Sequence, residues 1–303
     1  MNRSTALLVF ALAFASAAAQ VEHRVHLFGG AVVTDPVNAL DSITFDLGVT
    51  PELRLHRTDL TVLPIALTDV DSVDFGPMAT WTFVDPRDSN VYAAVTIGDQ
   101  CWMAENLRYL PSVVNAAVGG TSTPWQYVHG YTGMDTALAM ATPAYTTYGV
   151  LYNWAAAMQG ASGSSTIPSG VQGICPDGWH LPSDDEVKQM EMHLGLTVAQ
   201  ANALNYRGTD QGSRLAGNAA LWEDGDLEAN AFFGSAGFNG LPGSVRSLGS
   251  FNNTLGEQFA WWTATDHGMD EAWYRGLHYS LTGILRNNIE REYGLSVRCV
   301  CDQ

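Results

Sequence analysis

The chain has 303 residues, of which 46% are hydrophobic, and its 31 acidic and 14 basic side chains give a formal net charge of −17. This apolar content excludes a disordered protein. The acidic excess argues against nucleic acid and anionic membrane surfaces as partners, because both require cationic patches. A chain of this length can form one large domain and a small one.

Residues 1–19 have the pattern of a secretory signal peptide. Arg3 supplies a positive charge near the start, residues 6–15 are almost wholly apolar, and residues 17–19 are the small alanines that a signal peptidase recognises. The apolar run is well short of the roughly 20 residues that span a bilayer, and no later segment is long and apolar enough. We therefore expect cleavage before Gln20, export, and no membrane span.

Residues 20–76 contain an internal repeat. Residues 24–45 align without gaps on residues 54–75, at an offset of 30 positions. Each copy alternates apolar and polar residues in short runs, which is the periodicity of β-strands. Units this small cannot bury an apolar face alone, so we expect two β-rich repeats that pack on each other or on the larger domain.

A short hinge leads into the larger domain, residues 80–303. Residues 81–84 and 91–97 are predicted strands, joined by a turn at residues 85–90. The chain is expected to end in a further strand at residues 293–300. Few helices, long polar loops and short strands together predict an α+β domain with an antiparallel sheet.

Two helices are predicted within this domain. The first covers residues 148–158, where apolar side chains recur at helical spacing. The second begins at Ser183, which can form a capping box with Glu186, and ends at Gly195. Residues 197–206 are expected to add a short third helix.

The four cysteines point to disulfide bonds, because an exported chain with an even number of cysteines is typically bridged. They are Cys101, Cys175, Cys299 and Cys301. Three pairings are open. The bridge from Cys299 to Cys301 is the least favoured, because one intervening residue leaves little room for unstrained geometry. A zinc site is also disfavoured, because Cys-x-Cys lacks the usual Cys-x-x-Cys spacing.

Six short motifs rich in aromatic residues, glycine and cysteine form a frame over the rest of the chain. They are VTIGDQCWMAENL (95–107), YGVLYNW (148–154), CPDGWHLPSDDE (175–186), GFNGLPGSVR (237–246), WWTAT (261–265) and GLSVRCV (294–300). In combination they resemble the Fibrobacter succinogenes major paralogous domain, a family found mainly in exported proteins of Fibrobacter and Bacteroidetes-type bacteria. The resemblance covers about residues 83–301.

The resemblance implies a C-type-lectin-like fold, which is distantly similar to that of formylglycine-generating enzymes. This fold has two main helices, a twisted antiparallel sheet and long loops. By the same analogy Cys175, just before the main helix, would bridge to Cys299 in the last strand. Cys101 and Cys301 would remain as a second pair, although a cysteine at position 301 departs from the usual family pattern.

Calcium is the one cofactor that the sequence brings into consideration. Calcium-dependent lectins of this fold carry Glu-Pro-Asn or Gln-Pro-Asp and a Trp-Asn-Asp strand, and none of these tripeptides occurs here. A looser candidate is the acidic turn formed by Glu223, Asp224, Asp226 and Glu228, whose carboxylates surround a glycine. The favoured interpretation is a solvated acidic turn, so we expect no metal or other cofactor.

Seven of the nine tryptophans fall into two classes. Four lie within the motifs and are predicted to be core residues: Trp102, Trp154, Trp179 and Trp262. Three are flanked by polar or loop residues and are candidates for stacking on a ligand: Trp125, Trp222 and Trp273.

The sequence does not favour an enzyme. Formylglycine-generating enzymes need a reactive cysteine pair near the C-terminus, and Cys299 and Cys301 have a different spacing. Cys175 and His180 could form a nucleophile and base. However, His180 lies in a G-W-H-L-P turn, where a structural hydrogen bond explains it. The acidic residues at 184–186 fit the first turn of a helix, where the helix dipole favours negative charge.

The sequence thus predicts an exported, non-enzymatic protein of the cell surface or extracellular medium. Its expected role is that of a binding, adhesion or structural module, with an extracellular protein or a glycan as partner. One alternative is a self-assembling surface or filament subunit, in which the N-terminal repeats add strands between copies. The other is a carbohydrate-binding lectin. An enzyme related to formylglycine-generating enzymes is the least favoured hypothesis.

Overall fold

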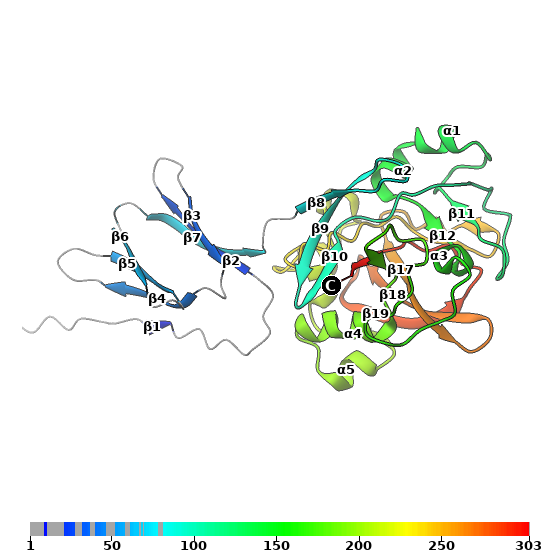
Figure 1. Ribbon diagram of the computed structural model, residues 1–303. Coiled ribbons are helices and arrows are strands. Elements are labelled where there is room, and N and C mark those ends of the chain that lie inside the picture. Colours follow the sequence, from blue (N-terminus) through cyan, green and yellow to red (C-terminus); the bar gives the residue numbers. More distant parts are fainter. Residues whose placement is uncertain are drawn as a thin grey trace, which may run out of the picture. The chain divides into compact units, whose positions relative to one another are not determined.

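Figure 1 shows the computed structural model, which forms two compact units, Met1–Ala79 and Thr80–Gln303. The described residues are 9–10, 21–27, 32–36, 40–46, 52–57, 61–66, 68, 70–77 and 81–302. Apart from a two-residue strand, the predicted signal peptide lies outside them. Within this described part of the chain, no helix is long and apolar enough to cross a membrane.

The N-terminal unit consists of two antiparallel sheets. One has the strand order β1-β4-β5-β6 and the other the order β3-β2-β7. The strands are β1 (Val9–Phe10), β2 (Val21–Leu27), β3 (Val32–Pro36), β4 (Leu40–Asp46), β5 (Glu52–Arg57), β6 (Val62–Ala66) and β7 (Val70–Pro77).

The two sequence repeats complete each other's sheets by exchanging strands. The first copy supplies β2, β3 and β4, but β4 pairs with β5 of the second copy, and β7 returns to pair with β2. The two exchanges have equivalent registers. Arg24 lies opposite Asp74, and its equivalent in the second copy, Arg54, lies opposite Thr44, which is the equivalent of Asp74 in the first copy. Neither copy therefore forms a complete sheet alone, which explains why the segment is duplicated.

The C-terminal unit is an α+β domain with several antiparallel sheets. The larger sheets have the strand orders β13-β20-β10-β9-β8 and β14-β19-β18-β17, and two hairpin-like pairs join β11 to β12 and β15 to β16. The strands are β8 (Trp81–Val84), β9 (Val91–Ile97), β10 (Gln100–Met103), β11 (Gln126–Tyr127), β12 (Leu151–Tyr152), β13 (Trp179–His180), β14 (Asn205–Arg207), β15 (Arg246–Ser247), β16 (Ser250–Phe251), β17 (Gln258–His267), β18 (Glu271–His278), β19 (Leu281–Glu290) and β20 (Val300–Cys301).

Short helices surround these sheets (Figure 1). They are α1 (Thr136–Met140), α2 (Pro143–Tyr148), α3 (Trp154–Met158), α4 (Asp184–His193), α5 (Val198–Asn202), α6 (Gln211–Leu215) and α7 (Asp226–Ala229). Among the described residues only α4 exceeds two turns. The structure therefore has one main helix, where the family resemblance implied two.

The predicted capping box at the start of α4 is confirmed. The Ser183 hydroxyl accepts the backbone N–H of Glu186 at 3.1 Å, and the Glu186 carboxylate accepts the backbone N–H of Ser183 at 2.9 Å. Gly195, at a φ of +110°, follows the end of the helix. These interactions are local in sequence, so the residue pattern alone was enough to find them.

The predicted helix at residues 148–158 is wrong, because the segment contains three different elements. Gly149 ends α2 with a φ of 77°, a conformation that other residues rarely adopt. Leu151 then lies in β12, and Asn153 caps α3 by accepting the backbone N–H of Ala156. Short runs of apolar residues do not distinguish a strand followed by one helical turn from a longer helix.

Two other predicted elements are confirmed in part. The strand–turn–strand is present, with the turn closed by a hydrogen bond from the Asp85 N–H to the Asn90 carbonyl at 2.8 Å. The last strand is shorter than predicted. Gly294, Leu295 and Ser296 form single bridges to different parts of the domain, and only β20 pairs continuously. This extended segment therefore holds several strands together instead of joining one sheet edge.

The four motif tryptophans are buried, as predicted. Three of their indole N–H groups are paired inside the core: Trp102 donates to the Gln100 side chain at 3.1 Å, Trp154 to the Thr263 carbonyl at 3.0 Å, and Trp262 to the Tyr152 carbonyl at 2.7 Å. The family motifs thus supply the large side chains that fill a loop-rich domain, and three of these four indoles are hydrogen-bonded there.

Candidate functional site

The groups with the most reactive chemistry gather around the C-terminal strand, β20. This strand lies between β13 and β10, with Trp179 opposite Cys301 and Trp102 opposite Val300. Figure 1 marks the C-terminus beside β10. We call the group formed by Cys101, His180, Glu186, Cys301 and Asp302 the clasp.

His180 is held between two carboxylates of the clasp. Its Nδ1 lies 2.7 Å from Oδ1 of Asp302, and its Nε2 lies 2.8 Å from Oε1 of Glu186. Burial disfavours the charged imidazolium, but the hydrogen bonds and charges of Glu186 and Asp302 outweigh it and raise the pKa of His180. His180 thus ties β13 to both the first turn of α4 and the C-terminal end of the chain.

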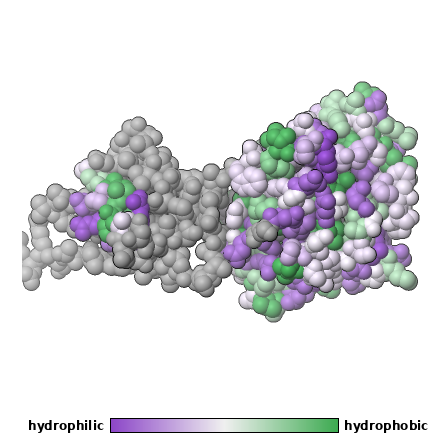
Figure 2. Space-filling model, viewed as in Figure 1, coloured by the Kyte–Doolittle hydropathy of each residue, from purple (hydrophilic) through white to green (hydrophobic). Residues whose placement is uncertain are grey.

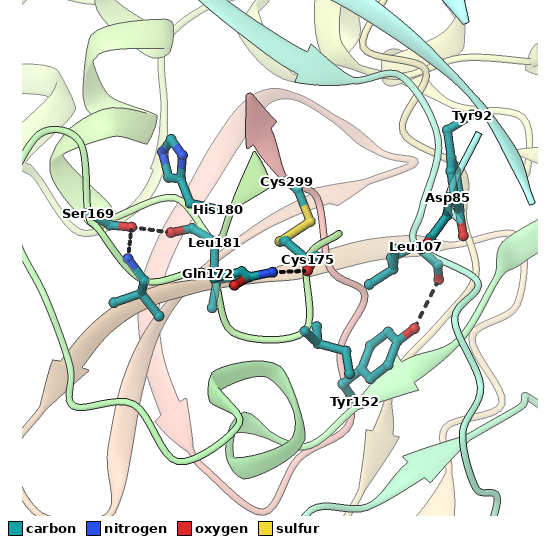
Figure 3. The surroundings of a disulfide bond; sticks show 12 residues. Asp85, Tyr92, Leu107, Tyr152, Ser169, Gln172, Cys175, His180, Leu181 and Cys299 are labelled. Carbon is teal, nitrogen blue, oxygen red and sulfur yellow. Dashed lines mark hydrogen bonds between the residues drawn. A yellow bond between two sulfur atoms is a disulfide. The ribbon is translucent and has the colours of Figure 1, made fainter. Parts of the chain in front are cut away.

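Cys175 forms a disulfide with Cys299, as the family resemblance implied. The two Cα atoms are 6.0 Å apart, and 124 residues separate them in sequence. In Figure 3 the ring of His180 points away from the disulfide sulfurs. The nucleophile and base considered for Cys175 and His180 are therefore not formed, because the sulfur is already oxidised and the imidazole binds carboxylates.

The predicted disulfide between Cys101 and Cys301 is absent, because both thiols are free. The two thiols nevertheless share a hydrogen bond across β10 and β20. That bond is the main reason why the pKa of Cys301 is lowered and that of Cys101 is raised. The resemblance thus brought the correct residues together, but in the structure they are free thiols and not a disulfide.

A buried charge network fastens α4 to the sheet formed by β14, β19, β18 and β17. Its contacts are Arg275 Nη1 to Asp184 Oδ1 (2.7 Å), Arg275 Nε to Glu191 Oε1 (2.6 Å), Arg286 Nη2 to Asp184 Oδ2 (2.8 Å) and Arg207 Nη2 to Glu191 Oε2 (2.7 Å). All five side chains are buried. Sequence analysis missed this network, although isolated arginines within otherwise apolar strands were a signal of it.

Asp184 is the centre of this network. Burial opposes its negative charge, but the hydrogen bond from Arg286, the charge of Arg275 and the contact with Lys188 outweigh it and lower the pKa of Asp184. Sequence analysis attributed the acids at the start of α4 to the helix dipole. The structure shows that Asp184 instead neutralises buried arginines on neighbouring strands, whereas Asp185 is half-buried and forms an ion pair with Lys188.

Arg298, in the last motif, is used entirely for structure. It donates to the Asn106 side chain at 2.7 Å and to the carbonyls of Met103, Asn239 and Phe238. Its guanidinium also lies over the Phe238 ring, 4.5 Å from the centroid. Burial lowers the pKa of Arg298 to about 9. The first, fourth and last motifs are therefore joined by one arginine that closes the domain.

The candidate ligand-binding tryptophans do not form one surface. Trp222 is wrong as a candidate, because it is only 5% exposed and its indole donates to the Gly217 carbonyl at 3.1 Å. Trp125 is half-buried against a small core cluster beside β11 and β12. Trp273 is half-buried on β18, with the Arg286 guanidinium 3.8 Å from its ring centroid. Trp125 and Trp273 therefore stay separate candidates, and the Trp125 indole N–H has no hydrogen-bond partner among the described residues.

The calcium candidate is not formed. Asp226 begins α7, and the Glu228 carboxylate accepts the Gly225 backbone N–H at 3.3 Å, so both acids stabilise a helix N-terminus. Glu223 and Asp224 are exposed. Across the residues that the structure describes, no group of three or more His, Cys, Asp or Glu side chains is arranged to hold a metal ion.

The clasp, the disulfide and the buried arginines all involve residues of the sequence motifs. A family model described as the Fibrobacter succinogenes major domain matches residues 95–301, more than half of the chain. The chain belongs to the Fibrobacter succinogenes major domain family. No curated protein and no solved structure matches it. The major domain therefore contains all six motifs and every clasp residue except Asp302, whereas the N-terminal repeats and β8 lie outside it.

The buried charge network predicts a large effect of Asp184→Asn. Removing the carboxylate leaves buried arginines unpaired, so we expect a loss of about 3–5 kcal/mol in the free energy of unfolding at pH 7, measured by urea denaturation. Because the folded pKa of Asp184 is lowered, its contribution is present above the unfolded pKa and declines as the pH falls below about 4. The matched control, Asp185→Asn, should cost only about 0–1 kcal/mol. Equal losses in the two variants would contradict the assignment.

The raised pKa of His180 predicts a pH-dependent contribution to stability. A charge stabilised in the folded state contributes fully below the unfolded pKa, near 6.5, and is lost as the pH rises through the folded pKa. The destabilisation caused by His180→Gln should therefore be larger at pH 5 than at pH 9 in urea titrations. If the destabilisation caused by His180→Gln instead increased with pH, the neutral ring would be the stabilising form.

Proposed function

We propose that the chain is an exported, non-catalytic binding module whose major domain has a C-type-lectin-like architecture. Its partner is a glycan or an extracellular protein. The observation that carries this proposal is the use of the motif residues. The disulfide, the carboxylates around His180 and the carbonyls around Arg298 already occupy the chemically versatile groups. Such a frame supports a surface and does not supply a reaction centre.

Export is supported by two independent features. The first is the signal-peptide pattern of residues 1–19. The second is the disulfide between Cys175 and Cys299, because structural disulfides persist mainly in oxidising compartments outside the cytosol.

The C-type-lectin-like architecture is supported by how the major domain closes. The last strand, β20, pairs with β10, so the two ends of the domain lie side by side. The Cys175–Cys299 disulfide joins the turn before β13 and α4 to the segment that leads into β20. Long loops connect these elements, as expected for this architecture.

The binding surface that we propose is a tyrosine face on the second sheet, formed by Tyr206, Tyr274, Leu285 and Asn287. Tyr206 lies opposite Leu285, and Tyr274 lies opposite Asn287. Opposed residues and alternate residues of a strand share one side of a sheet, so the four side chains project together. Tyr206 is 38% exposed, and the other three are half-buried.

The chemistry of this face suits recognition of a neutral polar ligand. Tyrosine offers an apolar ring and a polar tip, and the Asn287 amide can both donate and accept hydrogen bonds. Figure 2 shows small separate hydrophobic patches among hydrophilic residues on one face of the chain. The tyrosine face therefore combines aromatic and amide groups without a fixed charge.

A glycan array with the mature chain tests the binding role. We expect a glycan signal that EDTA does not change, because among the described residues no group of three or more His, Cys, Asp or Glu side chains is arranged to hold a metal ion. The double variant Tyr206→Ala/Tyr274→Ala should lower affinity more than tenfold, since central aromatic residues of an interface typically contribute about 2 kcal/mol or more. Tyr206→Phe/Tyr274→Phe is the matched control, because it keeps both rings.

Two outcomes would count against this assignment. Equal binding by the alanine variant and the wild-type chain would exclude the tyrosine face as the site. An array that is blank with and without calcium would reject the glycan as partner.

Self-assembly is a second candidate, favoured by the edges of the N-terminal unit. Strand β1 pairs with the outer edge of β4, yet β1 belongs to the segment that we expect to be cleaved. By the internal symmetry, the matching edge belongs to β7, which pairs only with β2 among the described strands. Cleavage would therefore leave two related edges open to strand addition between copies.

Sedimentation of the mature chain, beginning at Gln20, tests this second candidate. Strand addition predicts an average mass that rises with concentration, and a lysine at the β4 edge, Thr44→Lys, should shift the association to higher concentration at least tenfold. A circular dichroism spectrum identical to that of the wild type is the control for folding. A monomer at all concentrations would reject the candidate.

A further inference from the structure

Cys101 and Cys301 are two free thiols that face each other across the pairing of β10 and β20. Trp102 lies opposite Val300 in the antiparallel pairing of β10 and β20, so the residues on either side of them, Cys101 and Cys301, also lie opposite each other. Both are free, and their thiols share a hydrogen bond. Opposed positions put both side chains on the same side of the sheet.

The backbone places these thiols within the range of a disulfide. The Met103 N–H donates to the Cys299 carbonyl at 3.0 Å, which makes this pair a hydrogen-bonded pair of the antiparallel ladder. Such pairs alternate along a ladder, so the pair two residues away, Cys101 and Cys301, is of the same type. Its Cα atoms are then roughly 5.5 Å apart, near the usual value for disulfides.

The two thiols differ in access and in acidity. Cys101 is buried, whereas Cys301 is half-buried near the C-terminus. The hydrogen bond from Cys101 is the largest cause that lowers the pKa of Cys301, and the nearby His180 acts in the same direction. A more accessible and more acidic thiol is the better nucleophile towards an external disulfide. Cys301 is therefore suited to attack first, and Cys101 to resolve the product.

We propose that Cys101 and Cys301 form a redox-active dithiol that closes reversibly by exchange with an external disulfide. The Cys301 thiolate attacks one sulfur of the donor disulfide and releases one donor thiolate. Cys101 then loses its proton and attacks the Cys301 sulfur, which breaks the mixed disulfide and releases the second donor thiolate. The donor gains two electrons and two protons, and the chain gains one disulfide.

Closure would fasten a very short strand of the sheet β13-β20-β10-β9-β8. β20 has only two residues, and only Asp302 follows it among the described residues. A covalent link to β10 would hold this strand, and with it the carboxylate of Asp302 beside His180. The Cys175–Cys299 disulfide differs from this pair, because both of its residues are fully buried. It should therefore resist exchange under conditions that open the Cys101–Cys301 bridge.

Glutathione buffers test the proposal on the full mature chain. The protein is equilibrated at a series of ratios of reduced to oxidised glutathione, alkylated, and mapped by non-reducing mass spectrometry of its peptides. We expect a Cys101–Cys301 crosslink that disappears as the buffer becomes reducing, while the Cys175–Cys299 crosslink persists at the same ratios. Two thiols that stay alkylatable throughout, or a bridge that opens only together with Cys175–Cys299, would overturn the proposal.

Single variants separate the two roles without removing the structural disulfide. In Cys101→Ser the mixed disulfide cannot be resolved, so glutathione should accumulate on Cys301. In Cys301→Ser the remaining thiol is buried, and glutathione should attach at least tenfold more slowly. Equal rates of attachment in the two variants would refute the assignment of Cys301 as the attacking thiol. Unchanged thermal unfolding of both variants under reducing conditions is the control for folding.

Discussion

The major domain depends on the pairing of buried charges between α4 and its sheet. Moving a carboxylate or a guanidinium out of water costs several kcal/mol, and only close partners offset this cost. Asp184 and Glu191 therefore fix α4 wherever Arg207, Arg275 and Arg286 can meet them. A helix placed mainly by apolar contacts could slide or rotate more easily, because hydrophobic attraction has no direction.

The contacts within the clasp also depend on the position of α4. Its first turn presents Glu186, which accepts two backbone N–H groups, from Ser183 and Ser169, and also contacts His180. His180 then meets Asp302, so the C-terminal end of the chain is held through the helix. In this way a charge network on one side of α4 sets the surroundings of β20 and its two free thiols. The helix α4 therefore supports both the buried charge network and the surroundings of the two free thiols.

The motif residues and the surface residues outside the motifs have different roles, and this difference follows from the same arrangement. Most of the motif side chains described above have their polar atoms paired inside the domain, although Trp261 Nε1 and Ser296 Oγ are buried without a partner among the described residues. A loop-rich fold needs such pairing because its backbone forms few long ladders. Surface residues outside the motifs do not have to pair polar atoms inside the domain. The tyrosine face and the β4 and β7 edges of the N-terminal repeats lie outside the motifs. Of the two free thiols, Cys101 lies within a motif, whereas Cys301 directly follows one.

The sequence by itself determined the features that depend on neighbouring residues. The capping box of Ser183 and Glu186, the turn between β8 and β9, and the duplication with an offset of 30 positions could all be read from the residue pattern. Only the tertiary structure decided the exchange of strands between the repeats, the split of residues 148–158, the burial of Trp222 and the arginine partners of Asp184. The reason is that these features join residues far apart in the chain, and the partner across a fold is not encoded in local propensity or periodicity.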